Sequence, residues 1–438
     1  MKYRQYLIAP AVLLFVSCFA TAQNNAAAGA NGTIIEQSSY AFPTYEQLPG
    51  WARQIYTKET FEGLRNSPEL ELLRIKYVSD GLKVVGFIYK PRIVEGKKLP
   101  VIIWNRGGAN EDAKIANNNF HDIYEMYRYA AAGFVVIASQ YRGIDGGEGK
   151  DEMGGADVDD VMNLVPLAKS LGYVDLNKLC IWGFSRGAQM ALQAIRRGLP
   201  VKAAVLVGVP TDWESTLKDS PNLLPVVREL WPDWERRREE HLKERSAIGW
   251  VDQLNVPLLI FQGAADPVIS TTRTMTFAQR LDESGKVYEL LVYAGDDHPV
   301  DQHREERLSR TIAWFKNPRK MSIAREIERT LRLKGQAAAN KEYFELKKNQ
   351  LDIYDFSERE LNQLGYILLA KGRATDAVEI FKLNVAAFPE SANTYDSLAE
   401  GYVAVGNREL AIRNYTKSLE LNPQNTNATD ALKKLAPK

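Results

Sequence analysis

Residues 180–192 of this 438-residue chain read Cys-Ile-Trp-Gly-Phe-Ser-Arg-Gly-Ala-Gln-Met-Ala-Leu. The apolar run up to Trp182 is typical of a buried strand, and the residues after Gly187 favour a helix. The Gly-x-Ser-x-Gly pattern between them is typical of a tight strand-to-helix turn that exposes a serine, with glycines where backbones approach closely. We interpret this stretch as a nucleophile elbow carrying Ser185. The alternative is an ordinary glycine-rich turn.

Short apolar runs recur on both sides of this stretch, and most of them precede an amphipathic, helix-like stretch. The expected strands are residues 72–78, 83–89, 101–104, 134–138, 179–182, 203–207, 258–261 and 288–292. The expected helices lie around residues 120–131, 156–170, 186–196, 272–283 and 303–315. This alternation predicts an α/β fold with a mostly parallel sheet covered by helices on both faces. The Asp80-Gly81 pair between the first two strands favours an antiparallel hairpin there.

A nucleophilic serine needs a base, and that base needs an acid to orient it. In elbow-containing folds of this kind the acid and then the histidine follow the serine along the chain. Asp266 follows the strand at 258–261, and His298 follows the strand at 288–292. The carboxyl ends of parallel strands can converge on one crevice. We therefore predict Ser185, Asp266 and His298 as the catalytic residues.

The chain has only four histidines, so few alternatives exist. His303 is the alternative base and Asp212 the alternative acid. His121 and His241 precede the acid on expected helices, where a structural or solvent-facing role fits better. Cys180, within a strand, is expected to be a small core residue.

Composition excludes several classes of function. The chain has 56 basic and 55 acidic side chains, a formal net charge of +1 that gives no reason to expect nucleic acid. Two cysteines exclude a disulfide scaffold and a cysteine-rich metal site, and four histidines argue against a multi-histidine centre. The expected chemistry requires no metal and no cofactor.

From about residue 75 to residue 315, the sequence resembles the catalytic domain of the prolyl oligopeptidase family, which comprises α/β-hydrolase serine peptidases and related esterases. The resembling stretches are residues 77–81, 140–143, 183–187, 256–268 and 295–298. The resemblance implies the same nucleophile, acid and base. Too few residues precede the first expected strands for the β-propeller of many family members, so their peptide specificity is not implied.

The expected oxyanion hole departs from the family pattern. Residues 105–108 read Asn-Arg-Gly-Gly, so Arg106 stands where many relatives have an aromatic residue or histidine. One donor is expected to be the backbone N–H of Arg186, and the second to come from Arg106 or Gly107. The Arg106 backbone and its guanidinium are both possible donors. A structural ion pair is an equally good interpretation of this arginine.

A cap is expected at residues 210–255, which contain four of the eight tryptophans: Trp213, Trp231, Trp234 and Trp250. These rings either form an apolar wall of the substrate pocket or pack a small helical cap onto the sheet.

The carboxyl third carries an internal repeat with an offset of 34 residues, the tetratricopeptide period. Leu364, Gly365, Leu368, Gly372, Ala377, Phe381 and Pro389 recur as Leu398, Ala399, Tyr402, Gly406, Ala411, Tyr415 and Pro423. We predict a helical domain over 319–438 with tetratricopeptide-like units at about 358–391 and 392–425. Residues 323–352 are a degenerate first unit or connecting helices. Because two units are fewer than usual, we expect them to dock on the hydrolase or on another chain, and such repeats usually bind protein partners.

The amino end has the features of a secretory signal: Lys2 and Arg4, an apolar run, then a small-residue cleavage site at Ala20-Thr21-Ala22. We predict a signal peptide at 1–22, a flexible leader at 23–44, the hydrolase at 45–318, and a secreted or periplasmic location. No segment is expected to span a membrane. Alternatively, residues 15–18 resemble a lipoprotein box, which would anchor the chain to the cell envelope through Cys18.

Together these features predict a secreted serine hydrolase that cleaves peptide bonds through an acyl-enzyme intermediate. One alternative is a carboxylesterase acting on small or carbohydrate-linked esters. The other is a secreted scaffold whose repeats bind a partner and whose hydrolase is inactive.

Overall fold

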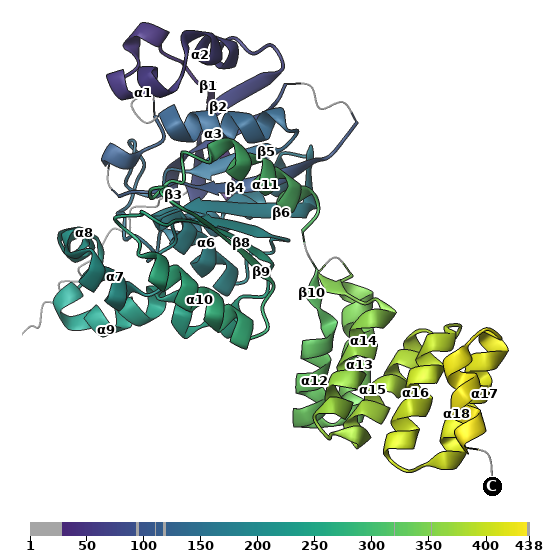
Figure 1. Ribbon diagram of the computed structural model, residues 1–438. Coiled ribbons are helices and arrows are strands. Elements are labelled where there is room, and N and C mark those ends of the chain that lie inside the picture. The colour runs from purple at the N-terminus through teal and green to yellow at the C-terminus, as the bar shows by residue number, and fades with distance from the viewer. Residues whose placement is uncertain are drawn as a thin grey trace, which may run out of the picture.

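A computed structural model of the chain describes residues 29–92, 96–109, 111–116, 120–318, 320–351 and 353–435. The expected signal peptide and Cys18 lie outside these residues. Figure 1 shows a sheet domain covered by helices, with a row of further helices, coloured green to yellow, beyond one end of it. None of the helices in the described part of the chain has both the length and the apolar character that crossing a bilayer requires.

The large sheet has the strand order β1-β2-β3-β5-β4-β6-β7-β8-β9. Its strands are β1 (Ile34–Ser39), β2 (Leu70–Ser79), β3 (Leu82–Pro91), β4 (Leu99–Asn105), β5 (Val135–Ser139), β6 (Val174–Phe184), β7 (Ala204–Val207), β8 (Leu258–Gly263) and β9 (Tyr288–Tyr293). The pairs from β5 through β9 are parallel, and those from β1 through β5 are antiparallel. The predicted α/β fold with a mostly parallel sheet is confirmed.

The turn between β2 and β3 and the edge strand β1 show how local sequence determines the antiparallel part of this sheet. The turn between β2 and β3 uses Asp80 at φ 51° and Gly81 at φ 79°, the pair of positive angles that a two-residue hairpin requires. Strand β1 lies where a flexible leader was expected. All but one of its residues are exposed, so it joins the sheet edge through main-chain pairing with β2 and has no apolar alternation to reveal it.

Helices cover both faces of the sheet. One face packs against α4 (Val158–Met162), α5 (Leu164–Ser170), α6 (Arg186–Arg196) and α10 (Thr271–Glu283). The other packs against α1 (Gly50–Ile55), α2 (Lys58–Arg65), α3 (Phe120–Ala131) and α11 (Arg304–Lys316). The expected helix at 156–170 is split because Pro166 has no N–H to donate, and a new helix beginning at Leu164 places it within a first turn.

A cap follows β7 and consists of α7 (Trp213–Asp219), α8 (Leu224–Leu230) and α9 (Trp234–Arg245). It has its own apolar cluster, in which Trp231 lies 5.2 Å from Trp213 and 5.5 Å from Trp234, measured between ring centroids. In Figure 1 these three helices lie at one side of the sheet.

The carboxyl-terminal part is all-helical. Its helices are α12 (Ile323–Lys334), α13 (Gln336–Asn349), α14 (Glu358–Ala370), α15 (Ala374–Ala387), α16 (Ala392–Ala404), α17 (Arg408–Leu421) and α18 (Thr426–Leu435). A short parallel pair, β10 (Met321–Ser322) with β11 (Tyr354–Asp355), precedes α12 and α14. The Arg325 guanidinium donates to the Asp282 carbonyl at 3.0 Å, and Val287 packs on the helical core, so these helices touch the sheet domain.

Candidate active site

Ser185 lies at the turn between β6 and α6. Its backbone has φ 51° and ψ −119°, a strained conformation for a residue with a side chain. The Ser185 N–H donates to the Val207 carbonyl at 2.8 Å, which fixes the turn against the end of β7. A Cβ added at Gly187 would lie 2.0 Å from the Asn105 carbonyl oxygen, so this position requires glycine. The sequence pattern and the backbone therefore agree on a nucleophile elbow.

Asp266 and His298 lie side by side at the ends of β8 and β9. His298 Nδ1 lies 2.7 Å from Asp266 Oδ2, and the Asp266 side chain is fully buried. The other carboxylate oxygen, Oδ1, accepts the N–H groups of Val268 at 2.7 Å and Ile269 at 2.8 Å. A carboxylate can only accept, so His298 donates through Nδ1 and its Nε2 is left free to accept a proton.

His298 also lies against the elbow. Its ring centroid is 4.9 Å from that of Phe184, the residue before Ser185. A Cβ at Gly208, the residue after β7, would lie 2.7 Å from His298 Nδ1. The imidazole thus sits over the ends of β6 and β7, beside the turn that carries the serine. The structure brings the three sequence-predicted residues to one edge of the sheet.

The residues considered as alternative base and acid, and the remaining histidines and Cys180, have other partners or surroundings. His303 Nδ1 lies 2.8 Å from Asp296 Oδ2, and Asp212 caps α7 by accepting from Ser215. His121 Nδ1 lies 3.3 Å from the hydroxyl of Tyr56, the residue after α1, and His241 Nε2 lies 2.6 Å from the Pro232 carbonyl oxygen in the cap. Cys180 is buried in β6, where desolvation raises the pKa of its thiol to about 12.

Arg186 is the first residue of α6, so its backbone N–H has no acceptor within the helix and is free to meet an anion. The Arg106 guanidinium is buried and donates to the carbonyls of Gln140, at 2.9 Å, and Gly107, at 3.1 Å. Burial, and then the nearby Arg186, lower its pKa to about 10. Because this side chain is already engaged, the backbone of residues 106–108 is the better source of a second donor.

An apolar cavity of about 150 Å³ opens beside Ser185. It is lined by Gly108, Ala109, Met153, Ser185, Arg186, Pro210, Trp213, Leu223, Val226, Val227, Val268 and Ile269. Of the four tryptophans expected near the substrate, only Trp213 lines it. Trp231 and Trp234 pack within the cap, and Trp250 lies in the main core, so these three are not brought to the cavity.

The cavity residues other than Ser185, Arg186 and Trp213 were missed by sequence reasoning. Met153 lies in a glycine-rich loop, and Val226 and Val227 belong to a cap helix that has no recognisable motif. A second cavity, of about 400 Å³, lies across the elbow and is lined in part by Phe184, Gly107, Pro299 and Ile55 of the amino-terminal helix α1. Both cavities share Gly108, so they flank the same turn.

Residues 119–321 match the family described as Prolyl oligopeptidase family. This match spans 203 of the 438 residues, and that part of the sheet domain is similar to the family. The resemblance drawn from the motifs and the prediction of a serine hydrolase of a peptidase kind are confirmed.

Three relatives show the extent of the similarity. The "Uncharacterized peptidase YtmA" of Bacillus subtilis is 26% identical over 253 residues, which cover 57% of this chain and 95% of the relative. The "Probable dipeptidyl-aminopeptidase B" of Pyrenophora teres f. teres is 26% identical over 306 residues, 62% of this chain but only 32% of the relative. The solved acylaminoacyl peptidase of Pyrococcus horikoshii shares the fold with a TM-score of 0.52 at 20% identity, over 58% of this chain and 43% of that one.

Proposed function

We propose that Ser185, Asp266 and His298 act as a catalytic triad that hydrolyses peptide bonds. The observation that carries this proposal is the 2.7 Å contact of His298 Nδ1 with buried Asp266, made beside the strained turn of Ser185. With Nδ1 directed at Asp266, Nε2 is the ring nitrogen that the triad mechanism uses to take the serine proton.

The reaction proceeds in two steps. His298 Nε2 takes the proton of Ser185 Oγ as the oxygen attacks the substrate carbonyl carbon, and Asp266 stabilises the imidazolium that forms. The N–H of Arg186 and an N–H of residues 106–108 bind the oxyanion, each contributing about 3 kcal/mol. The imidazolium then gives its proton to the leaving amine, and water activated by His298 hydrolyses the acyl-enzyme.

The cavity beside Ser185 supports an apolar side chain on the acyl side of the cleaved bond. Its volume of about 150 Å³ and its aliphatic and indole lining suit a group about as large as benzene. We favour peptides over esters because relatives of known name, such as the Bacillus subtilis protein, are described as peptidases. The second cavity, with Ile55 and Phe184, would receive the part of the substrate on the other side of the bond.

Labelling and a matched pair of substrates test this proposal. A fluorophosphonate probe should label the wild-type protein at Ser185, and Ser185→Ala should not be labelled. N-acetyl-leucine p-nitroanilide and the corresponding p-nitrophenyl ester differ only in the leaving group. Turnover of both supports a peptidase, and turnover of the ester alone supports the carboxylesterase alternative. Labelling of Ser185→Ala at the wild-type rate would reject the triad.

Filling the apolar cavity should change the preference for the acyl group. Val226 lines the cavity and is half-buried, so Val226→Phe can occupy the space without disturbing the main core. We expect kcat/KM for the leucine ester to fall at least about 10-fold relative to the alanine ester, a discrimination typical of a filled apolar pocket. Measurement of kcat/KM for both esters checks this. An equal change for the two substrates would mean that the acyl group lies elsewhere.

We further propose that the chain is exported by its amino-terminal signal and that α14 to α17 form two tetratricopeptide-like units. Supporting the second point, α14 and α16, and likewise α15 and α17, begin 34 residues apart. Such helix pairs would bind a protein partner while the sheet domain carries the catalytic activity.

A further inference from the structure

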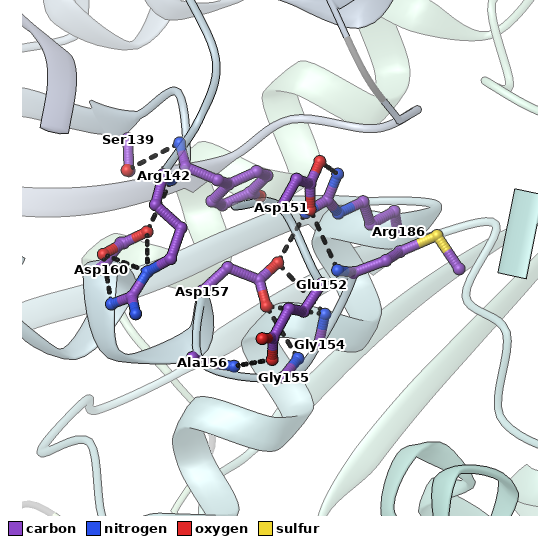
Figure 2. A network of polar contacts seen from close by, with 12 residues as sticks. Ser139, Arg142, Asp151, Glu152, Gly154, Gly155, Ala156, Asp157, Asp160 and Arg186 are labelled. Carbon is purple, nitrogen blue, oxygen red and sulfur yellow. Dashed lines mark hydrogen bonds and ion pairs between the residues drawn. The ribbon is translucent and has the colours of Figure 1, made fainter. Parts of the chain in front are cut away.

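The side chain of Arg186 is buried directly beneath the elbow and is held by two carboxylates. Its NH1 donates to Asp151 Oδ2 at 2.7 Å and its NH2 to Asp157 Oδ2 at 2.6 Å, as Figure 2 shows. The exposed fractions of the three side chains are 3%, 5% and 0%. Neither carboxylate was singled out by the sequence, and neither touches the proposed triad.

Burying a guanidinium is costly unless it is paired and hydrogen-bonded. Burial alone would raise the pKa of Asp151, but the charge and hydrogen bonds of Arg186, together with the Met153 N–H and the Arg106 charge, outweigh burial and lower this pKa. The Tyr141 ring lies 4.5 Å from the Arg186 guanidinium and adds a cation–π contact. The guanidinium is therefore confined on several sides.

The segment that carries the two carboxylates is itself fixed. Asp157 Oδ1 accepts the N–H groups of Gly154, at 3.0 Å, and Gly155, at 2.7 Å. Gly154 has φ 92°, and a Cβ there would lie 2.2 Å from Gln189 Nε2 on α6. This loop thus packs tightly on the helix that begins at Arg186, and the carboxylates cannot follow the arginine if it moves.

The same cluster reaches the other side of the proposed oxyanion hole. Arg186 NH1 donates to the Gly108 carbonyl at 3.3 Å. Tyr141 lies between the two arginines, with its ring 4.9 Å from the Arg106 guanidinium and its hydroxyl donating to the Arg106 carbonyl at 3.3 Å. One buried network therefore holds the residue after the nucleophile and the turn at residues 106–108.

We propose that Asp157 and Asp151 are positioning residues of the oxyanion hole, acting through the Arg186 side chain. This inference rests on the proposed triad mechanism. Arg186 carries both the guanidinium that the two carboxylates hold and the backbone N–H that binds the oxyanion. If the guanidinium is held less firmly, the backbone N–H can therefore move. A misplacement of about 1 Å at a reacting centre can cost about 100-fold in rate.

The variant Asp157→Asn tests this directly. The amide oxygen can keep the bonds from Gly154 and Gly155, so the new amide nitrogen faces Arg186 and replaces an acceptor by a donor. We expect kcat for the leucine ester to fall about 100-fold, with KM within a few-fold of wild type. The affinity for N-acetyl-leucinal, an aldehyde that forms a tetrahedral oxyanion adduct, should fall in parallel with kcat. Affinity for the corresponding alcohol should not change.

The matched control is Asp160→Asn on the same segment, also drawn in Figure 2. Asp160 is equally buried and pairs with Arg142 at 2.8 Å, but Arg142 lies away from the elbow. Burial raises the pKa of Asp160 to about 6, so an assay at pH 8 keeps Asp160 ionised in the wild-type protein. This variant should lose thermal stability to a similar extent and keep kcat within a few-fold of wild type.

Equal losses of kcat in Asp157→Asn and Asp160→Asn would contradict the proposal, as would a loss in Asp157→Asn without weaker binding of the aldehyde. Either result would mean that the cluster has only a structural role. Asp151→Asn carries the same expectation and replaces Asp157→Asn if that protein melts below the assay temperature. A Ser185→Ala protein that remains active would instead reject the triad itself. The two failures are therefore distinguishable.

Discussion

Replacing His298 by alanine is expected to lower kcat for the leucine ester by about 10⁶-fold, while His303→Ala stays within a few-fold of wild type. Both histidines follow Asp266 in the sequence, and both have a carboxylate partner at less than 3 Å. Only His298 lies against Phe184 and Gly208, beside the serine turn. Without its imidazole no group can take the proton of Ser185, so acylation fails.

The measurement is release of p-nitrophenol at saturating ester, with fluorophosphonate labelling as a second readout. His298→Ala should label far more slowly than wild type, because the probe also requires a deprotonated serine oxygen. The two variants remove the same atoms from side chains that are 14% and 40% exposed, so their melting temperatures provide the folding control. A large loss in His303→Ala with activity retained in His298→Ala would reverse the assignment of the base.

The sequence was sufficient for the fold and for the grouping of Ser185, Asp266 and His298, because each depends on order along the chain. Apolar runs followed by helices specify parallel strands, and the ends of consecutive parallel strands meet at one edge. Ser185, Asp266 and His298 each follow such a run, so their proximity could be predicted without any contact being known. The same reasoning favoured a structural or solvent-facing role for His121, which lies on α3.

The sequence could not show which side chains meet in loops that have no helical or strand periodicity, because packing between distant segments decides those contacts. Asp151 and Asp157 lie in a loop with several glycines, and nothing local indicates that both would face one arginine. The sequence did not decide whether Arg106 is an oxyanion donor or part of an ion pair. In the structure its guanidinium instead donates to main-chain carbonyls. Side-chain direction at these positions depends on Tyr141, which lies between the arginines and comes from a different strand end.

The four tryptophans of the cap show the same limit. Their closeness in the sequence suggested a shared role, but their environments differ. The Trp213 indole N–H donates to Gln189 Oε1 at 2.8 Å and the ring lines the cavity, whereas Trp250 packs into the sheet core. The Trp231 indole N–H donates to the Met153 carbonyl at 3.2 Å, which ties the cap to the loop carrying Asp151 and Asp157. The cap and the cluster of Arg186, Asp151 and Asp157 are therefore adjacent parts of one packed unit.

Asp266, the acid of the proposed triad, can be tested with a substitution that preserves its shape. Asp266 uses Oδ1 to accept from the backbone of Val268 and Ile269, and Oδ2 to accept from His298 and Gln262. In Asp266→Asn the amide oxygen is held by the two backbone N–H groups, so the amide N–H₂ must face the imidazole. His298 Nδ1 then has to accept, and its proton moves to Nε2, where it cannot receive the proton of Ser185.

We therefore expect Asp266→Asn to fold with a melting temperature near that of wild type and to lose about 10⁴-fold in kcat for the leucine ester. The control is Asp212→Asn, which changes the alternative acid. Asparagine caps helices as well as aspartate does, so this variant should keep α7 and its activity. A loss confined to Asp212→Asn would assign the acid to that residue. A loss in Asp266→Asn with KM unchanged would show that the carboxylate acts through the histidine tautomer, because the buried Asp266 side chain lines neither of the two cavities proposed to bind the substrate.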